Sequence, residues 1–132
     1  MAEIRSFRDL NVYQKARDEA KAIFQLSKSF PKEERYSLTD QVRRSSRAVN
    51  AMIAEAWAKR RYEAALVSKI NDALGEAMET QSWLDHALDC EYITAPQFAQ
   101  LNAEWQHIGG MLNRMIERAA EFCRSPQKSK TT

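Results

Sequence analysis

Glycine, proline, cysteine and histidine are scarce in this chain of 132 residues, with three, three, two and two copies respectively. An all-β sandwich or barrel of this length needs many more turn residues, so the sequence excludes those classes. No apolar run approaches the roughly 18 residues of a membrane span, and the mean hydropathy is −0.61. These absences predict a protein with no membrane partner.

Two further absences bear on the compartment. Residues 1–8 lack the apolar core of a secretory signal peptide. The two cysteines, Cys90 and Cys123, are too few for a disulfide scaffold and fit a reducing compartment. We therefore predict a cytoplasmic protein.

Proline positions and apolar spacing together predict helices. Pro31, Pro96 and Pro126 divide the chain into blocks, because proline is excluded from helix interiors. Within the blocks, apolar residues recur every three or four positions, as on one face of a helix. The predicted helices cover about residues 9–29, 38–58, 62–90 and 95–123.

The connections between these helices are short, so consecutive helices are expected to be antiparallel neighbours. The predicted fold is all-α, an up-down-up-down antiparallel four-helix bundle. The length fits one domain, which we place at residues 1–124, followed by a disordered polar tail at residues 125–132.

Residues able to carry catalysis or to hold a metal are few. Glu104 and His107 form one Glu-x-x-His pair of the kind found in di-iron bundles, but Trp83 stands where His86 would need a second glutamate. There is no Cys-x-x-Cys motif and no glycine-rich phosphate loop. We predict no catalytic residue, no metal, no cofactor and no enzymatic activity. A helical enzyme of the chorismate mutase type is the least favoured alternative, because the arginines fall mainly outside the apolar stripes.

Positive charge is concentrated in one segment. Between residues 41 and 62, six basic residues and one acidic residue give a net charge of +5, whereas the whole chain carries +2. Arginine matches phosphate oxygens well, so this cluster is a candidate phosphate-binding surface. The alternative interpretation is a solvated face whose arginines pair with acidic neighbours. The predicted nucleic-acid-binding residues are Arg43, Arg44, Arg47, Lys59, Arg60 and Arg61.

The same helix is predicted to carry a second apolar side, away from the core positions Val49, Met52 and Ala56. A helix that is apolar on two sides needs two neighbours, and an exposed apolar patch indicates association. The alternative is that the first helix and Phe7 cover this side. The predicted oligomer interface consists of Ala51, Ile53, Ala54, Trp57 and Ala58.

Several stretches resemble a family of small bacterial four-helix-bundle proteins. These proteins are encoded by intervening sequences within 23S ribosomal RNA genes, and they are related to the accessory variability protein of diversity-generating retroelements. The resemblance covers about residues 7–123. It is carried by Phe7-Arg8-Asp9-Leu10, Val12-Tyr13-Gln14-Lys15-Ala16, Phe30-Pro31, the segment 36–46 (Tyr-Ser-Leu-Thr-Asp-Gln-Val-Arg-Arg-Ser-Ser), Ile53-Ala54-Glu55, and Ala73-Leu74-Gly75 with Glu79.

The resemblance implies a homo-oligomer, a ring-like pentamer in characterised relatives, without enzymatic activity. It also implies that the retroelement relatives bind structured RNA and a reverse transcriptase through basic surface. The residues matched to that surface here are Arg43 and Arg44. The predicted function is therefore a non-enzymatic, pentameric protein that binds structured RNA. The alternative is a protein-interaction scaffold, or an accessory subunit of an enzyme such as a reverse transcriptase, without direct RNA binding.

Overall fold

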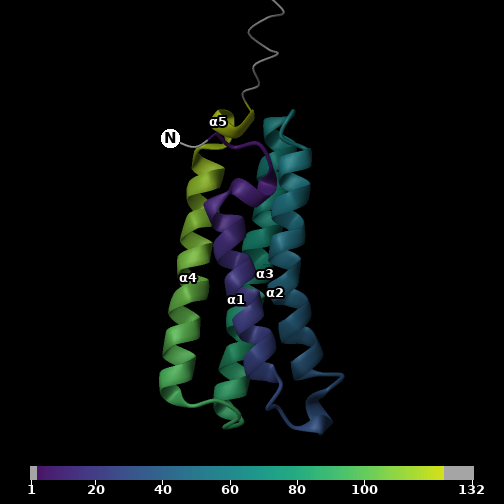
Figure 1. Ribbon diagram of the computed structural model, residues 1–132, viewed down its shortest axis with the longest axis vertical. Helices are drawn as coiled ribbons and strands as arrows, with labels where there is room; N and C mark the ends of the chain where they lie inside the picture. The colour runs from purple at the N-terminus through teal and green to yellow at the C-terminus, as the bar shows by residue number, and fades with distance from the viewer. Residues whose placement is uncertain (1–2, 124–132) are drawn as a thin grey trace, which may run out of the picture.

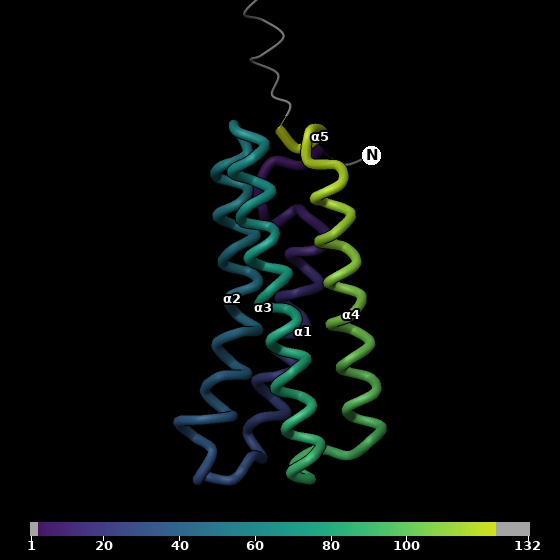
Figure 2. The backbone as a smooth tube through the Cα atoms, turned by 180° about the vertical axis from the view of Figure 1, so that it is seen from behind, coloured from purple at the N-terminus to yellow at the C-terminus, as the bar shows by residue number. Residues whose placement is uncertain are grey.

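The computed structural model describes residues 3–123, and the chain is helical throughout this range apart from short connections. The four long helices of the described range lie side by side along the longest axis of the molecule, and the chain reverses direction at each connection between them (Figures 1 and 2). The all-α class is confirmed. The long helices are α1 (Asn11–Ser27), α2 (Leu38–Ala58), α3 (Glu63–Asp89) and α4 (Ala95–Glu117).

Short helices complete the described chain. The 3₁₀ helix η1 (Phe7–Asp9) precedes α1, η2 (Lys32–Glu34) joins α1 to α2, and α5 (Ala119–Cys123) follows α4. The predicted polar tail at residues 125–132 lies outside the described residues. No helix between residues 3 and 123 has the length and apolarity that a bilayer crossing requires.

Capping side chains set two of the helix starts. The Thr94 hydroxyl accepts a hydrogen bond from the backbone N–H of Gln97 at 3.2 Å, and the side-chain carbonyl of Gln97 accepts one from the backbone N–H of Thr94 at 2.8 Å. This capping box satisfies two backbone N–H groups, and Pro96 sits in the first turn, where proline costs little. Ser6 and Asp9 form an equivalent box at η1. Helix α4 therefore begins where the sequence predicted.

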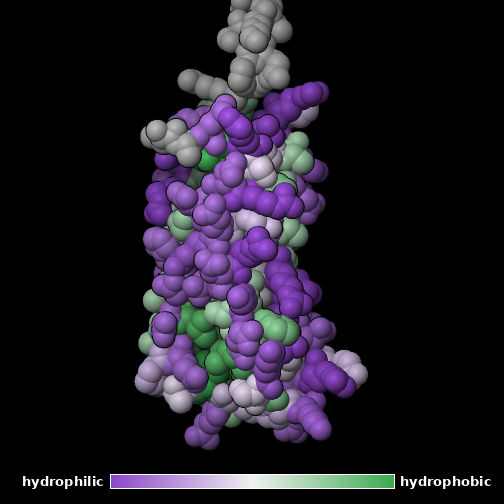
Figure 3. All heavy atoms as spheres, viewed as in Figure 1, coloured by the Kyte–Doolittle hydropathy of each residue, from purple (hydrophilic) through white to green (hydrophobic). Residues whose placement is uncertain are grey.

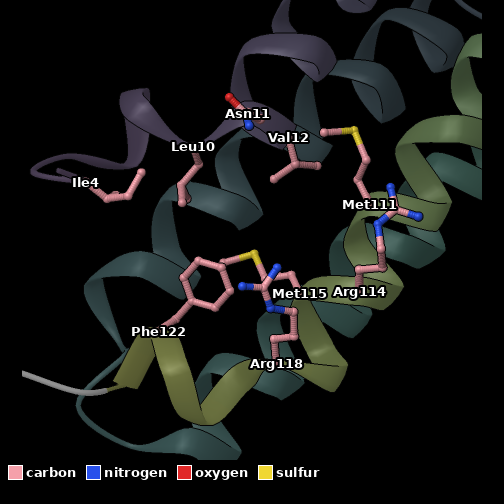
Figure 4. Close-up of a pocket in the computed structure, with 9 residues that line it drawn as sticks. All are labelled: Ile4, Leu10, Asn11, Val12, Met111, Arg114, Met115, Arg118 and Phe122. Carbon is pink, nitrogen blue, oxygen red and sulfur yellow. The ribbon is translucent and has the colours of Figure 1, made fainter. Parts of the chain in front are cut away.

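The end of α4 differs from the prediction of one helix over residues 95–123. Helix α4 ends at Glu117, the backbone turns at Arg118 (φ −105°, ψ 22°), and α5 continues in a new direction. The spacing of apolar residues does not reveal this break, because Ala119 and Cys123 stay buried after the turn. Figure 4 shows Phe122 beside Arg118, across a hollow from the start of α1.

One continuous core holds the helices together, and the most extensive contact between two helices is that of α2 with α3. Inside that pair the hydroxyls of Ser45 and Thr80, both fully buried, are 2.8 Å apart and hydrogen-bonded. A satisfied polar pair in an apolar core favours one register of the two helices over others. The largest fully buried apolar side chains are Trp105, Ile23, Ile53, Leu66, Ile70, Leu84, Ile108, Leu112, Val42 and Val49.

The contact between α1 and α4 is much smaller than that between α2 and α3. In the view of Figure 3, hydrophilic residues cover most of the surface over α1 and α2, whereas an apolar area is open between the lower parts of α1 and α4. Half-buried apolar residues at these helix ends are Leu26 on α1 and Phe98 and Leu101 on α4. In this view, polar residues therefore cover the core least completely between α1 and α4.

Candidate nucleic-acid interface

The six basic residues predicted to bind nucleic acid do not form a single surface. Arg43 and Arg47 lie against α1, Arg44 lies against α3, and the other three follow the end of α2. Arg43 and Lys59 are about 24 Å apart along the helix, at 1.5 Å per residue. Each group must therefore be considered separately.

Arg44 is neutralised by carboxylates of α3. Its guanidinium forms ion pairs with Glu79 and with Glu76, the latter at 3.3 Å, and Gln41 accepts a hydrogen bond from its Nε at 3.1 Å. The hydrogen bond to Glu76 is the largest cause that raises the pKa of Arg44. The structure thus gives Arg44 acidic partners, as the alternative interpretation of the basic segment expected.

Arg43 and Arg47 instead surround an aromatic ring of α1. Their guanidinium carbons lie 4.8 and 5.5 Å from the centroid of the Phe24 ring, and the Lys28 ammonium lies 4.9 Å from it. Arg43 also donates from Nε to the buried Ser27 hydroxyl at 2.7 Å. Cation–π contacts of this kind orient a cation without neutralising its charge. Three positive charges therefore gather around one ring.

Two more basic residues of α1 extend this cluster. Arg17 and Lys21 line a hollow of about 340 Å³ together with Arg47, Phe24 and Asn50. The Asn50 side chain donates to the Tyr13 carbonyl at 3.0 Å and so ties α2 to α1 beside the hollow. Sequence reasoning missed Arg17, Lys21 and Lys28, because it summed charge along one segment and did not pair the faces of two helices.

We call the resulting surface the basic stripe, composed of Arg17, Lys21, Lys28, Arg43 and Arg47. Three of its members and Phe24 fall at positions 17, 21, 24 and 28, which share one side of α1. Within residues 3–123, none of the five basic residues forms an ion pair with a carboxylate. The stripe therefore presents five uncompensated positive charges on the surface formed by α1 and α2.

The basic residues after α2 form a smaller group. Arg60 donates to the Trp57 carbonyl at 2.8 Å, and its guanidinium carbon lies 4.0 Å above the Trp57 ring. Lys59 and Arg61 are exposed, and neither forms an ion pair with a carboxylate within residues 3–123. Lys59 and Arg61 are accessible, but none of the three residues lines the hollow, so they belong to a separate patch.

The predicted oligomer interface on α2 needs one correction. Ile53 is 0% exposed and belongs to the core, so it cannot contact another subunit. The reason is that α2 packs against both α1 and α3, which widens its buried arc to include Ile53 and leaves Met52 half-buried at the margin. Ala51 and Ala58 are exposed, whereas Ala54 and Trp57 are half-buried. These four residues remain at the surface.

The Glu-x-x-His pair has a different role from metal binding. Glu104 forms an ion pair with Lys15 of α1, and this hydrogen bond is the main reason that its pKa is lowered. Burial, together with the nearby Glu104 carboxylate, raises the pKa of Glu19. Among residues 3–123, no group of three or more histidine, cysteine, aspartate or glutamate side chains is placed to hold a metal ion.

Comparison of the sequence with models of known protein families identifies the family of this chain. A family model described as "23S rRNA-intervening sequence protein" matches residues 8–114. The chain belongs to this family. The basic stripe lies inside the matched region, and so do all the residues predicted to bind nucleic acid. The resemblance inferred from the sequence motifs is therefore confirmed.

A solved structure supports the same assignment. The chain is similar to a protein of unknown function from the S23 ribosomal protein family of Bacteroides thetaiotaomicron VPI-5482, with 32% sequence identity and a TM-score of 0.73. The similarity covers 80% of this chain and 95% of that chain. Comparison with curated proteins gives no match.

Proposed function

We propose that this protein is a non-enzymatic RNA-binding protein that works as a homo-oligomer, a pentameric ring of up-down-up-down four-helix bundles. The observation that carries the proposal is the basic stripe, in which five positive charges from α1 and α2 lack carboxylate partners within residues 3–123. Structured RNA is the proposed ligand, because its phosphates match a cluster of arginine and lysine side chains.

The local geometry favours phosphate contacts. Arg17, Lys21 and Arg47 line the same hollow, so a single phosphate group there is within reach of three positive side chains. The Phe24 ring contacts the guanidinium groups of Arg43 and Arg47, and apart from the Arg43 Nε–H, which donates to Ser27, no hydrogen bond within residues 3–123 occupies their N–H groups. Neutralising phosphates releases condensed counterions, which drives binding at low salt concentration.

Self-association would multiply this surface. Each subunit of a ring contributes one basic stripe, and linked weak sites reach a combined affinity far above that of one site. The exposed residues Ala51 and Ala58, with the half-buried Ala54 and Trp57, support an interface on α2. Small side chains permit close approach of a neighbouring helix, and Trp57 offers a large contact area beside them.

The test is a titration of a fluorescently labelled structured RNA with the purified protein at low salt. The double substitution Lys21→Glu with Arg47→Glu should reduce affinity at least a hundredfold, because two attractive charges become repulsive. Arg114→Glu is a matched control for reversal of an arginine charge, since Arg114 lies on α4, is exposed and has no ion pair within residues 3–123. Equal losses for both proteins would contradict the assignment of the stripe.

A second function is favoured by one observation. The apolar area between the lower parts of α1 and α4 (Figure 3) suits a protein partner better than a nucleic acid. If the wild-type protein binds no RNA at low salt, we would favour a protein-interaction scaffold or an accessory subunit.

A further inference from the structure

We infer that the basic stripe recognises the sugar–phosphate backbone of double-helical RNA without reading its bases, an inference that rests on the proposed RNA binding. Proteins that hold single-stranded nucleic acid combine positive charge with aromatic rings on which bases stack. Proteins that hold double-stranded RNA recognise its shape, its phosphates and its 2′-hydroxyls. The arrangement of aromatic rings along the stripe distinguishes these two modes.

No aromatic ring along the described stripe offers a free face to a base. The Phe24 ring is half-buried, and three basic side chains, those of Lys28, Arg43 and Arg47, lie within 5.5 Å of its centroid. Tyr13, the other ring at the hollow, is half-buried and packs edge-on against Phe7, with ring centroids 4.9 Å apart. A base therefore has no stacking platform there.

The exposed tyrosines lie elsewhere in the fold. Tyr36 is 84% exposed in the connection between η2 and α2, and Tyr62 is 66% exposed in the connection between α2 and α3. Neither lines the hollow. Stacking on these rings would place a base beyond an end of α2, outside the hollow.

Three charges of the stripe, those of Lys28, Arg43 and Arg47, are also held by contacts with α1. Arg43 is anchored by Ser27 and by the Phe24 ring, and the bond from Asn50 to the Tyr13 carbonyl joins the two helices. From Arg17 to Lys28 the stripe extends about 16 Å along α1. A row of positive charges on two joined helices suits phosphates that are already fixed by a double helix, whereas a flexible strand loses conformational freedom when it is ordered on the same row.

Salt dependence gives the expected size of the preference. With one phosphate per positive side chain, the slope of log affinity against log salt is about −4.5 for a duplex and about −3.5 for a single strand. If the electrostatic contribution vanishes near 1 M salt, this difference makes the duplex about tenfold tighter at 0.1 M.

The experiment compares blunt RNA duplexes of about 16 base pairs with a single strand of the same length that cannot pair with itself. A duplex of this length exposes two successive minor grooves. Two duplexes of unrelated sequence should bind with affinities within about twofold of each other, and each should bind about tenfold tighter than the single strand. A single strand that binds as tightly as the duplexes would overturn the inference while leaving RNA binding intact. A protein that binds neither RNA would overturn both proposals.

A substitution at the ring tests the mechanism separately. Phe24→Leu removes the aromatic ring but keeps every positive charge. Because the ring orients Arg43 and Arg47, the duplexes and the single strand should lose affinity by factors that agree within about threefold. If bases stack on Phe24, the single strand should instead lose about tenfold more affinity than the duplexes. Circular dichroism and thermal unfolding of the variant establish that it folds, and Phe24→Tyr, which keeps a ring at this position, is the matched control.

Discussion

Two arginines that lie close together in the sequence should respond differently to the same substitution. Arg47 belongs to the basic stripe, whereas Arg44 is paired with Glu76 and Glu79 of α3. Replacing each by glutamine removes one positive charge and keeps a shorter, polar side chain. The comparison therefore separates the surface observed in the structure from the charge cluster predicted along α2.

The expected magnitude follows from the five charges of the stripe. For the wild-type protein, a slope of about −4.5 means that a fourfold rise in salt lowers affinity for a short RNA hairpin about 500-fold. Removing Arg47 should change the slope to about −3.6, so the same rise in salt lowers affinity only about 150-fold. At 0.1 M salt the Arg47→Gln variant should bind about eightfold more weakly than the wild type.

Arg44→Gln should leave this slope unchanged, because the charge that it removes is already compensated. Its main effect should be on stability, with a loss of up to about 1 kcal/mol for a half-exposed ion pair. The assay is fluorescence anisotropy of the labelled hairpin at four or more salt concentrations, with urea unfolding of each variant. A reduced slope for Arg44→Gln together with an unchanged slope for Arg47→Gln would refute the assignment of the basic stripe.

Three further predictions concern assembly and stability. Ala58→Glu places a charge on the exposed small-residue side of α2 and should lower the particle mass measured by light scattering, whereas an unchanged mass would place the interface elsewhere. Gly75→Ala should raise the free energy of unfolding by about 1 kcal/mol, since Gly75 lies inside α3 and a Cβ there meets nothing within 4 Å; a loss of stability would instead indicate a close neighbour in an assembly. Tyr92 donates to Glu34 at 2.8 Å, and this bond raises the pKa of Tyr92 to about 12. The neutral phenol is thus favoured in the folded state, so the stabilisation should be complete below the ordinary value near pH 10 and lost as pH rises from about 10 to about 12. Urea unfolding across this range should show a steeper fall for the wild type than for Tyr92→Phe, and parallel curves would contradict the role of the bond.

Much of the fold could be predicted from the sequence because helix formation depends on local features. Proline positions, the Thr94 capping box and the apolar period placed the starts of the helices close to where the structure has them. The same features did not reveal the turn at Arg118. An apolar period records which residues are buried, and Ala119 and Cys123 are buried whether or not the axis of the helix changes direction.

The candidate site depended on contacts between helices, which the order of residues along one helix does not specify. Composition and spacing by themselves determined an all-helical protein with a basic segment in α2 and with apolar stripes long enough to build a core. Only the tertiary structure decided that Arg44 meets carboxylates of α3, that Ile53 is enclosed between helices, and that Arg43 and Arg47 join basic residues of α1 around Phe24. The physical reason is that a charge becomes a binding site or one half of an ion pair according to its neighbours in space, and for these residues the neighbours come from other helices.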